Sequence, residues 1–324
     1  MLGAVILCFY IFGKLKMANY LVTGAAGFIG SAVANSLLQK NNIVVTIDNL
    51  STGYSENVPK GAIFIEGDCG NALVYDKVPK LAFDAIIHIA GQSSGEISFD
   101  DPIYDIKTNA ESTLLLLKFA LQNNCKRFIY AGTMSVYGKK PDNPISESSS
   151  CKPESFYGVA KLASEHYMRI YQKYGINYTS LRLFNVYGPG QNLDNLRQGM
   201  VSIFLAQMLN NNHILVKGLP DRYRDFIHID NVVDVFNKCI ESSDSWGLNI
   251  NVATGIKTSV AELIELMCKL YNRNVSIEYS GSTEGDIHGI YADTTLMNKV
   301  FKKLDVISLE DGLQEMLIWI QSKN

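Results

Sequence analysis

Residues 23–30 of this 324-residue chain read Thr-Gly-Ala-Ala-Gly-Phe-Ile-Gly, and this stretch decides the fold. The residues before it, 19–22, predict a short buried strand, while residues 31–38 place apolar side chains at helical spacing. A glycine-rich turn between a strand and a helix aims backbone N–H groups at an anion, and the helix dipole adds to the attraction. The stretch therefore predicts a phosphate-binding turn, although an ordinary strand–loop–helix connection can also contain these glycines.

Each glycine of the turn has its own expected role. Gly24 permits the tight turn, Gly27 lets a pyrophosphate approach the backbone, and Gly30 lets the helix pack closely on the sheet. Their spacing is GxxGxxG rather than the commoner GxGxxG. Residues 43–47 predict a second apolar strand, which ends in Asp48. A carboxylate there suits the ribose hydroxyls of NAD and would repel the additional phosphate of NADP, so the sequence predicts an NAD site.

Composition and charge narrow the class of protein. A chain of 324 residues has room for one large α/β domain or two closely packed ones, and a hydrophobic content of 47% supports a substantial core. The net charge of −3 gives no overall basic signal for nucleic acid. The cysteines are scattered and match no metal-ligand spacing, which predicts reduced thiols, a cytoplasmic location and no metal site. The six are Cys8, Cys69, Cys125, Cys151, Cys239 and Cys268.

Residues 1–16 form an unusual N-terminal extension. The stretch from Met1 to Phe12 is almost wholly apolar, but it is too short to span a bilayer, which takes about 20 residues. It has neither the basic start nor the small-residue cleavage site of a secretory signal. Because Met17 stands just before the first strand, we interpret 1–16 as an upstream start or a dispensable extension. A weak membrane-surface anchor is the alternative; no other membrane association is expected.

The first half of the chain alternates strands and helices, which predicts a doubly wound parallel sheet of the α/β class. Ligands bind at the C-terminal edge of such sheets. The predicted strands are 19–22, 43–47, 62–68, 84–91, 127–132 and 177–184, and the predicted long helices are 101–123 and 155–174.

The second half is less regular. We expect a cofactor-binding domain over 17–184 and a smaller, discontinuous, mainly substrate-binding domain over 185–324, with some of its segments returning to the first sheet. Residues 185–190 are expected to form a turn-rich exit from the last strand of the first half. Further helices are predicted at 199–210, 230–241 and 258–271, further strands at 214–216, 225–229, 248–252 and 276–279, and two helices close the chain.

Tyr157, Lys161 and Thr133 are the candidate catalytic residues. Tyr157 and Lys161 are four apart, so they share one face of a helix, and a lysine ammonium favours the phenolate form of a nearby tyrosine. The positive nicotinamide would lower the tyrosine pKa further, which makes a general base near neutral pH. Thr133 follows a predicted strand at the same edge, where its hydroxyl could bond a substrate oxygen. The three together suit removal of a hydride from an alcohol carbon, whereas a plain surface Tyr–Lys pair is the alternative.

With these residues in place, the sequence resembles the extended short-chain dehydrogenase/reductase family, in its NAD-dependent nucleotide-sugar epimerase/dehydratase branch. The matching stretches run in the family's order and cover nearly the whole chain from residue 19. The resemblance implies a Rossmann-type sheet with a smaller substrate domain. The stretches are TGAAGFIG at 23–30, DNLSTG at 48–53, HIAG at 88–91, TMSVYG at 133–138, YGVAK at 157–161, RLFNVYGPGQ at 182–191, RDFIHID at 224–230 and GDIHGIYAD at 285–293.

The resemblance also implies a role for each matching position. Tyr157 is the base, Lys161 also holds the nicotinamide ribose, and Thr133 assists at the sugar. The cofactor contacts are Gly24, Gly27, Phe28, Ile29 and Gly30 on the pyrophosphate, Asp48 on the adenosine ribose, Asp68 and Cys69 beside the adenine, and Ala90 and Gly91 along the middle. The nucleotide-sugar contacts are Asn185 and Arg224, with Arg224 on the diphosphate or else in a surface ion pair, and Arg222 as a second candidate. His88 and His228 are expected to be structural.

Two positions depart from the family pattern. Members that dehydrate sugars at C4 and C6 carry an acid pair directly after the catalytic threonine, because elimination needs an acid and a base. Here those positions are Met134 and Ser135, which argues for simple epimerisation. The family often has an arginine two residues before the late Gly-Asp pair, but this chain has Thr283 followed by Glu284. The identity of the nucleotide-sugar, or its pose, is therefore left open.

These observations predict an NAD-dependent nucleotide-sugar 4-epimerase, most like one for UDP-glucose or a UDP-N-acetylhexosamine. Hydride would leave C4, a 4-keto sugar would form, and hydride would return to its opposite face. Reactions on the same fold are the alternatives: 4,6-dehydration, decarboxylation of a UDP-uronate, or net reduction at C4. A non-catalytic NAD or nucleotide-sugar sensor is the alternative of another class. Supply of surface-polysaccharide precursors would follow from the family alone.

The resemblance further implies a homodimer. Its interface would pair the helices at 101–123 and 155–174 with their copies in a four-helix bundle. Apolar side chains for this purpose, unless they face the domain's own core, are Leu114, Leu117, Tyr167 and Tyr171.

Overall fold

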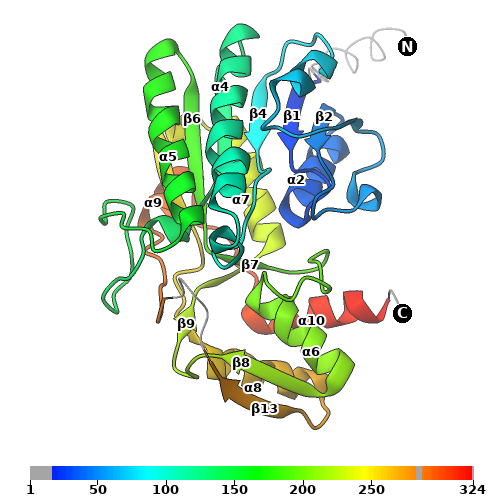
Figure 1. The fold of residues 1–324 in the computed structure, drawn as a ribbon, viewed down its shortest axis with the longest axis vertical. Coiled ribbons are helices and arrows are strands. Elements are labelled where there is room, and N and C mark those ends of the chain that lie inside the picture. Colours follow the sequence, from blue (N-terminus) through cyan, green and yellow to red (C-terminus); the bar gives the residue numbers. More distant parts are fainter. Residues whose placement is uncertain (1–16, 282–286, 323–324) are drawn as a thin grey trace, which may run out of the picture.

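The computed structural model describes residues 17–281 and 287–322, and its largest element is a seven-stranded parallel sheet in the order β11-β6-β5-β4-β1-β2-β3. This arrangement confirms the predicted doubly wound sheet (Figure 1). The N-terminal extension 1–16 and the departing positions Thr283 and Glu284 lie outside the described residues. The strands are β1 Asn19–Thr23, β2 Ile43–Asp48, β3 Ile63–Glu66, β4 Ala85–His88, β5 Arg127–Thr133, β6 Asn177–Leu183 and β11 Leu248–Val252.

Helices cover both faces of this sheet. On one face α4 packs against β4, and α5 packs against β5 and β6. On the other face α2 packs against β1 and β2, α7 against β5 and α9 against β11, and α7 contacts both α2 and α9. The central strands are buried on both sides, which explains their nearly continuous runs of apolar residues. The bounds are α2 Phe28–Gln39, α4 Ser112–Gln122, α5 Phe156–Tyr171, α7 Ile229–Glu241 and α9 Thr295–Phe301.

The long helix predicted over 101–123 is interrupted. It consists of α3 Pro102–Ile106, a π-helical turn Lys107–Glu111 and α4. A π turn accommodates one extra residue, and here it buries Asn109, whose side chain donates to the carbonyl oxygen of Gln92 at 2.9 Å. The interruption therefore turns a polar side chain towards the loop that follows β4.

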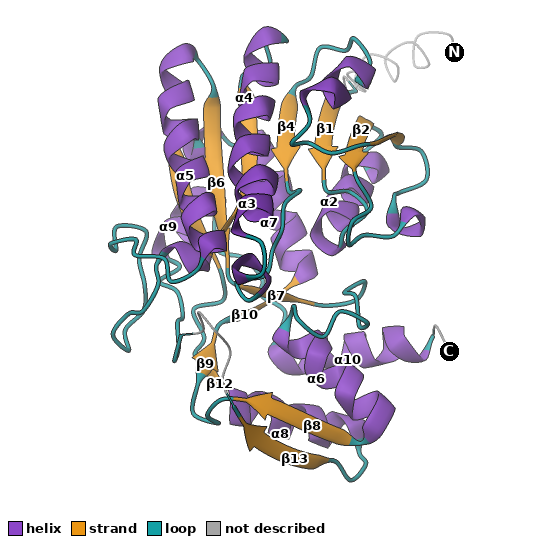
Figure 2. Cartoon of the chain, in the orientation of Figure 1, coloured by secondary structure: helices purple, strands orange, loops and turns teal. Residues whose placement is uncertain are grey.

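The second half of the chain builds a separate layer beyond the carboxyl ends of the large sheet. The strand arrows of that sheet point towards this layer (Figure 2). Its core joins residues such as Phe204, Leu263 and Met316. Residues 185–190, predicted as a turn, begin with a short strand that pairs with β10. The bounds are β7 Asn185–Tyr187, α6 Met200–Asn211, β8 His213–Lys217, β9 Tyr223–Arg224, β10 Phe226–His228, β12 Thr258–Ser259, α8 Val260–Tyr271, β13 Ser276–Ser280 and α10 Leu309–Gln321.

Some late segments lie in the first layer. β11 pairs in parallel with β6, matching Leu248 with Thr179 and Val252 with Leu183, so the chain returns to the sheet after crossing the second layer. Helices α7 and α9 also pack on the sheet. The division into 17–184 and a discontinuous 185–324, with some late segments in the first sheet, stays a prediction about where cofactor and substrate bind.

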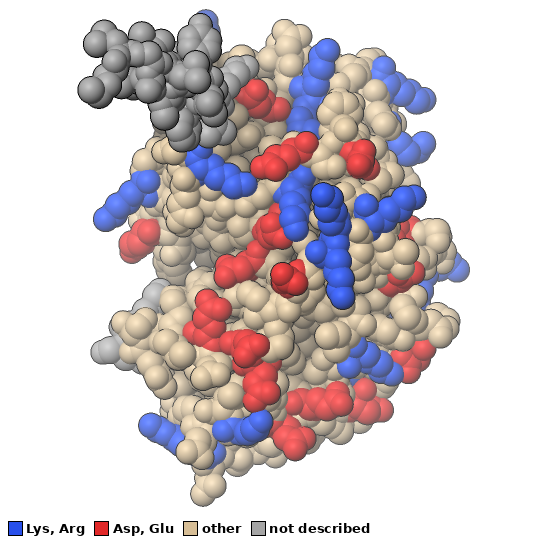
Figure 3. All heavy atoms as spheres, turned by 180° about the vertical axis from the view of Figure 1, so that it is seen from behind, with Lys and Arg blue, Asp and Glu red and all other residues tan. Residues whose placement is uncertain are grey.

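The surface carries both signs of charge. On the face opposite the view of Figure 1, acidic side chains form a band across the middle and lower part, next to basic side chains (Figure 3). Among residues 17–281 and 287–322, no helix is long and apolar enough to cross a membrane.

Candidate active site

The turn between β1 and α2 is tightly folded against its neighbours. Gly24 has φ +77°, a left-handed conformation that favours glycine, and its N–H donates to the carbonyl oxygen of Ile47 at 2.8 Å. A Cβ atom on Gly30 would lie 1.9 Å from the Gly24 carbonyl oxygen. A Cβ on Gly27 would meet that oxygen only at 3.3 Å. The turn is thus held open at its outer side and closed at its base, as a pyrophosphate cradle requires.

A cavity of about 280 Å³ extends from this turn along the carboxyl edge of the sheet. Its wall includes Asp48, whose two carboxylate oxygens accept hydrogen bonds from the N–H groups of Ala26 at 2.9 Å and Leu50 at 2.8 Å. The carboxylate is therefore fixed before any ligand arrives, and the cradle and the acid fit NAD. The cavity also brings together the other residues predicted around the cofactor: Gly24, Gly27, Phe28, Ile29, Gly30, Asp68, Cys69, Ala90 and Gly91.

Substitutions in the cradle provide a direct test of this fit. We expect Gly30→Ala to reduce stability by about 1–3 kcal/mol, because the methyl group cannot enter without moving the Gly24 backbone, and to release NAD. Gly27→Ala is the matched comparison: it should fold nearly normally but bind NAD more weakly. Bound NAD is measured in the supernatant after denaturation of purified protein, and stability by thermal unfolding. Equal NAD content and equal melting temperature in Gly30→Ala and wild type would contradict the packing argument.

Thr133, Tyr157 and Lys161 come together at the end of β5 and the start of α5. All three are almost fully buried, and none lines either of the two cavities of the site. The Lys161 Nζ donates to the carbonyl oxygen of Ala131 at 3.1 Å and lies 5.8 Å from the centre of the Tyr157 ring. The Thr133 Oγ1 accepts a hydrogen bond from the Ser135 N–H at 3.1 Å, which begins the short helix after β5. The structure therefore places the phenol and the ammonium on one buried face of α5.

Burial shifts the pKa of both groups away from their ordinary values. Desolvation raises the pKa of Tyr157 to about 12, while the Thr133 hydroxyl lowers it and the charge of Asp105 raises it. Desolvation lowers the pKa of Lys161 to about 8, and the charge of Asp105 opposes this shift. The raised pKa favours the neutral phenol of Tyr157, and a positive charge bound nearby would lower this pKa.

A second cavity of about 320 Å³ lies between the sheet and the second layer. It contains the predicted nucleotide-sugar contacts Asn185, Arg224 and Arg222, together with Met134 and Ser135. Ser93 and Gln198 line both cavities, so the two form one continuous cleft.

Among the described lining residues of the second cavity, four cationic side chains stand beside two acidic ones. Arg224 is buried, and backbone carbonyls position its guanidinium, with Nη1 donating to Tyr223 O at 2.7 Å and Nη2 to Ile287 O at 3.0 Å. Two further cations, Arg197 and Lys217, both approach the Glu96 carboxylate at 3.5 Å. Positive side chains facing one cavity are suited to an anionic group such as a diphosphate.

His88 and His228, the two histidines expected to be structural, are buried and lie close to polar groups of neighbouring residues. His88 is fully buried, with Nδ1 2.7 Å from the Thr23 hydroxyl and Nε2 3.3 Å from the Ser112 hydroxyl. Desolvation and then Lys161 keep the pKa of His88 well below its usual range. His228 is also buried and accepts a hydrogen bond from the Asp230 N–H at the start of α7. Neither lines the cleft.

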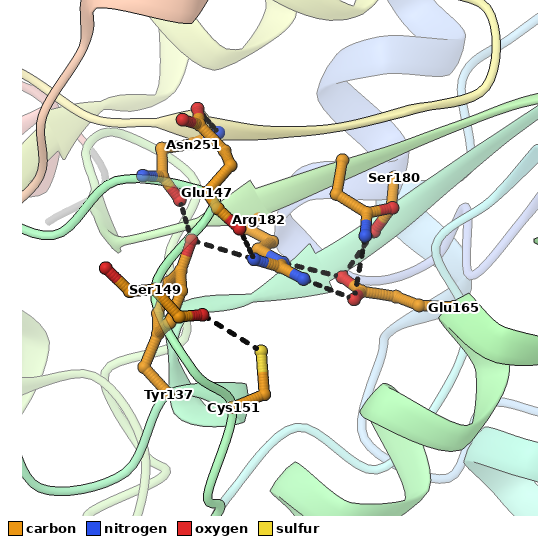
Figure 4. Close-up of polar contacts among 9 residues, drawn as sticks. Tyr137, Glu147, Ser149, Cys151, Glu165, Ser180, Arg182 and Asn251 are labelled. Atoms are coloured by element: carbon orange, nitrogen blue, oxygen red, sulfur yellow. Dashed lines mark hydrogen bonds and ion pairs between the residues drawn. The ribbon is translucent and has the colours of Figure 1, made fainter.

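Behind the face of α5 that carries Tyr157 and Lys161, a buried polar network joins the helix to the sheet. Glu165 accepts two hydrogen bonds from the Arg182 guanidinium, at 2.9 and 2.7 Å, and both side chains are almost fully buried. The Tyr137 hydroxyl accepts from Arg182 at 2.9 Å and donates to Asn251 at 2.6 Å. Figure 4 shows Glu165 reaching from α5 to Arg182 in the centre, with Tyr137, Glu147 and Asn251 on the far side.

The sequence did not predict a buried polar group in α3, the short helix that packs against α5. Asp105, in α3, accepts hydrogen bonds from the side-chain amides of Gln92 and Asn109. Gln92 lines the first cavity. No pattern in the sequence marks Asp105 as buried, because a long amphipathic helix over 101–123 has room for an acid on its exposed side; the π turn is what turns this part inward.

A family model described as "NAD dependent epimerase/dehydratase family" matches residues 20–253. The chain belongs to this family. Its members are NAD-dependent, so the NAD predicted from Asp48 and the glycine turn is confirmed as the cofactor. Tyr157, Lys161 and the whole first cavity lie within the matched residues.

Similar members of the NAD-dependent epimerase/dehydratase family match along almost the whole chain. A putative UDP-glucose 4-epimerase of Methanocaldococcus jannaschii is 31% identical over 307 residues, which are 94% of this chain and 99% of that protein. The crystal structure of UDP-glucose 4-epimerase from Thermotoga maritima with UDP-glucose superposes with a TM-score of 0.90 at 31% identity, covering 94% and 99% of the two chains. The crystal structure of UDP-glucuronic acid 4-epimerase from Bacillus cereus, in complex with UDP-glucuronic acid and NAD, superposes with a TM-score of 0.85 at 27% identity. The match covers 94% of this chain and 100% of that one.

Proposed function

We propose that this protein is a nucleotide-sugar 4-epimerase that acts on a UDP-hexose. The observation that carries the proposal is the continuous cleft: an NAD-type cavity joins a cation-lined cavity through Ser93 and Gln198, with the Tyr157 and Lys161 pair behind its wall. The similar solved epimerases bind UDP-glucose and UDP-glucuronic acid, which supports a UDP-sugar as substrate.

In this proposal each residue of the chain has one task. When bound, NAD supplies the chemistry that side chains lack, which is removal of a hydride from C4 of the sugar and its return to the opposite face of the 4-keto form. Tyr157 takes the proton of the C4 hydroxyl and later gives it back. Lys161 stabilises the phenolate, and Thr133 bonds the same substrate oxygen. Arg224, held by two backbone carbonyls, binds the diphosphate.

The cavity favours epimerisation over 4,6-dehydration. Met134 and Ser135, the positions after Thr133, both line it, and neither can act as an acid or a base near neutral pH. Among the lining residues that the structure describes, the acids are Glu96 and Glu154. Glu96 is engaged with Arg197 and Lys217, which makes it a poor candidate for proton transfer at C6.

A panel of nucleotide sugars tests the reaction and the substrate together. Purified protein is incubated with UDP-, GDP- and dTDP-hexoses without added cofactor, and the sugar ring protons are followed by NMR. We expect a new C4 epimer of a UDP-hexose at equilibrium, because NAD is regenerated in every cycle. A 4-keto-6-deoxy product would identify a dehydratase, and release of carbon dioxide from a UDP-uronate a decarboxylase.

The remaining alternatives give different outcomes in the same assay. A net 4-reductase would turn over only 4-keto sugars and only with added NADH or NADPH. A sensor would bind NAD and a nucleotide sugar without converting any member of the panel. Either outcome would overturn the epimerase.

We also propose a homodimer, formed through α3, α4 and α5. Leu117 is fully buried in the chain's own core, and Tyr167 and Tyr171 pack against that core, so these three are poor interface residues. Large apolar side chains exposed on the same helices are a better basis for it. Sedimentation at several protein concentrations measures the assembly, and a monomer throughout would refute it. The large apolar side chains exposed on α3, α4 and α5 are Ile103, Tyr104, Ile106, Leu121, Phe156, Val159 and Ile170.

We further propose a cytoplasmic location. Cys69, Cys125, Cys151, Cys239 and Cys268 all have free thiols, which suits a reducing compartment. Cell fractionation measures the location, and recovery of the protein with the membrane fraction would refute the proposal.

A further inference from the structure

Asp105 is a buried carboxylate that the proposed reaction does not yet use. It lies in α3 with no exposed surface. Its Oδ2 accepts hydrogen bonds from the Gln92 Nε2 at 2.9 Å and the Asn109 Nδ2 at 3.2 Å. Its Oδ1 is also buried and has no hydrogen-bond partner among the described residues. A buried carboxylate oxygen without a hydrogen bond costs free energy of folding. Its presence therefore calls for an explanation, which we seek in the neighbouring residues.

Asp105 lies on a helix that packs against the helix carrying Tyr157 and Lys161, the proposed catalytic pair. Helix α3 packs against α5 and against the π turn before α4. The negative charge of Asp105 raises the pKa of both Tyr157 and Lys161, which lie on the buried face of α5. Other titratable groups near this pair are His88, which is kept neutral, and Tyr130, whose ring lies 4.7 Å from the Lys161 Nζ. Among the described residues, the titratable side chains near Tyr157 and Lys161 are thus Asp105, His88, Tyr130 and, one turn further along α5, Glu165.

We propose that Asp105 is a positioning residue, whose negative charge sets the pH range in which Lys161 and Tyr157 work together; the inference rests on the proposed acid–base role of that pair. Asp105 touches neither reacting atom. Its negative charge opposes the desolvation that lowers the pKa of the buried Lys161.

The sign of the effect follows from the charges. A negative neighbour favours the cation of Lys161, so removing it lowers the pKa of Lys161. The same neighbour disfavours the anion of Tyr157, so removing it lowers the pKa of Tyr157 as well. The pKa of Asp105 is raised, chiefly by burial, and the amides of Gln92 and Asn109 and the charge of Lys161 partly offset this shift. The charge effect therefore requires a pH above the raised pKa of Asp105.

Asp105→Asn is the sharpest variant, because an asparagine has the same shape and keeps an oxygen for both amide donors. We expect both limbs of its pH–rate profile to move to lower pH by about one unit. Asp105→Ser, which is smaller and neutral, should shift the profile in the same direction, whereas Asp105→Glu, which keeps the charge, should leave the limbs near their wild-type positions. Glu111→Gln removes an exposed acid from the adjoining π turn and is the matched control, with no expected shift.

A second measurement does not depend on turnover. The phenol of Tyr157 is titrated by ultraviolet difference absorption in NAD-loaded protein, as the difference between each protein and its Tyr157→Phe counterpart. Asp105→Asn should titrate at lower pH than wild type by about one unit. Because this readout needs no substrate, it separates a failure of the inference from a failure of the proposed 4-epimerase activity.

The inference has clear contrary outcomes. If Asp105→Asn and Asp105→Ser lose activity or stability while both pH limbs and the phenol titration stay at their wild-type positions, Asp105 is only structural. If the phenol titration is unchanged in every variant, Asp105 is protonated at working pH and exerts no charge effect. If Glu111→Gln moves the limbs equally, the effect belongs to the overall charge of the protein.

Discussion

Tyr157→Phe is expected to lower turnover by about 10²–10⁴-fold and to leave NAD bound. The substitution removes one oxygen from a side chain that is only 8% exposed and keeps the ring that packs beside Lys161. The cofactor cavity is lined by other residues, so its shape should not change. Turnover is measured by NMR with the substrate identified in the panel, and bound NAD by release on denaturation.

Tyr167→Phe is the matched control for this variant. Tyr167 lies on the same helix, ten residues further along, and is partly buried against the core rather than near the cleft. Its phenylalanine variant should turn over at the wild-type rate. If Tyr157→Phe also retained near wild-type turnover, the proton transfer assigned to Tyr157 would be wrong.

Breaking the buried Glu165–Arg182 pair is expected to have the largest effect on stability. Either Glu165→Leu or Arg182→Met leaves one charge buried without its partner, which costs about 3–5 kcal/mol. The double variant removes both charges together and should recover much of that loss, because well-packed apolar residues can replace a buried ion pair. Urea unfolding of the four proteins measures the difference.

An exposed pair provides the comparison. On α7 the Lys238 Nζ lies 2.8 Å from the Asp234 Oδ2, and the two side chains are 36% and 46% exposed. Asp234→Ala should change the free energy of unfolding by less than about 1 kcal/mol. If Glu165→Leu cost no more than Asp234→Ala, the network in Figure 4 would not be what holds α5 against the sheet.

The fold could be predicted from sequence because its determinants are local. The strand, glycine turn and helix around residues 19–38 and the apolar runs of the next strands are patterns within a few residues. The order of the strands in the sheet was not predicted and comes from the structure. The π turn at Lys107–Glu111 could not be predicted, since residues around Asn109 have the periodicity of an ordinary helix. The strand Asn185–Tyr187 was missed because it exists only through its pairing with β10.

The candidate site divides in the same way. The residues of the NAD cavity stand in short motifs, so the sequence predicted them as a group, and the structure brings them together. Arg182 also lies in a matched stretch, but its partner Glu165 is 17 residues earlier, and nothing in the sequence pairs the two. Asp105 and Gln92 were missed because each acquires its importance from a neighbour contributed by another element. The spacing of residues within one helix or strand does not predict contacts between residues of separate elements.

The return of the chain to β11 affects how the protein can be made. Strand β6 has only β5 as a neighbour until residues 248–252 are available, because β11 forms its other edge. During synthesis, a chain released up to residue 184 therefore exposes an open strand edge and the apolar face that α7 and α9 later cover. Such edges invite pairing with other chains, so a truncated NAD-binding half should aggregate rather than fold. The nucleotide-binding sheet becomes a finished unit only when nearly four-fifths of the sequence has emerged, as its last strand ends at Val252 of 324 residues.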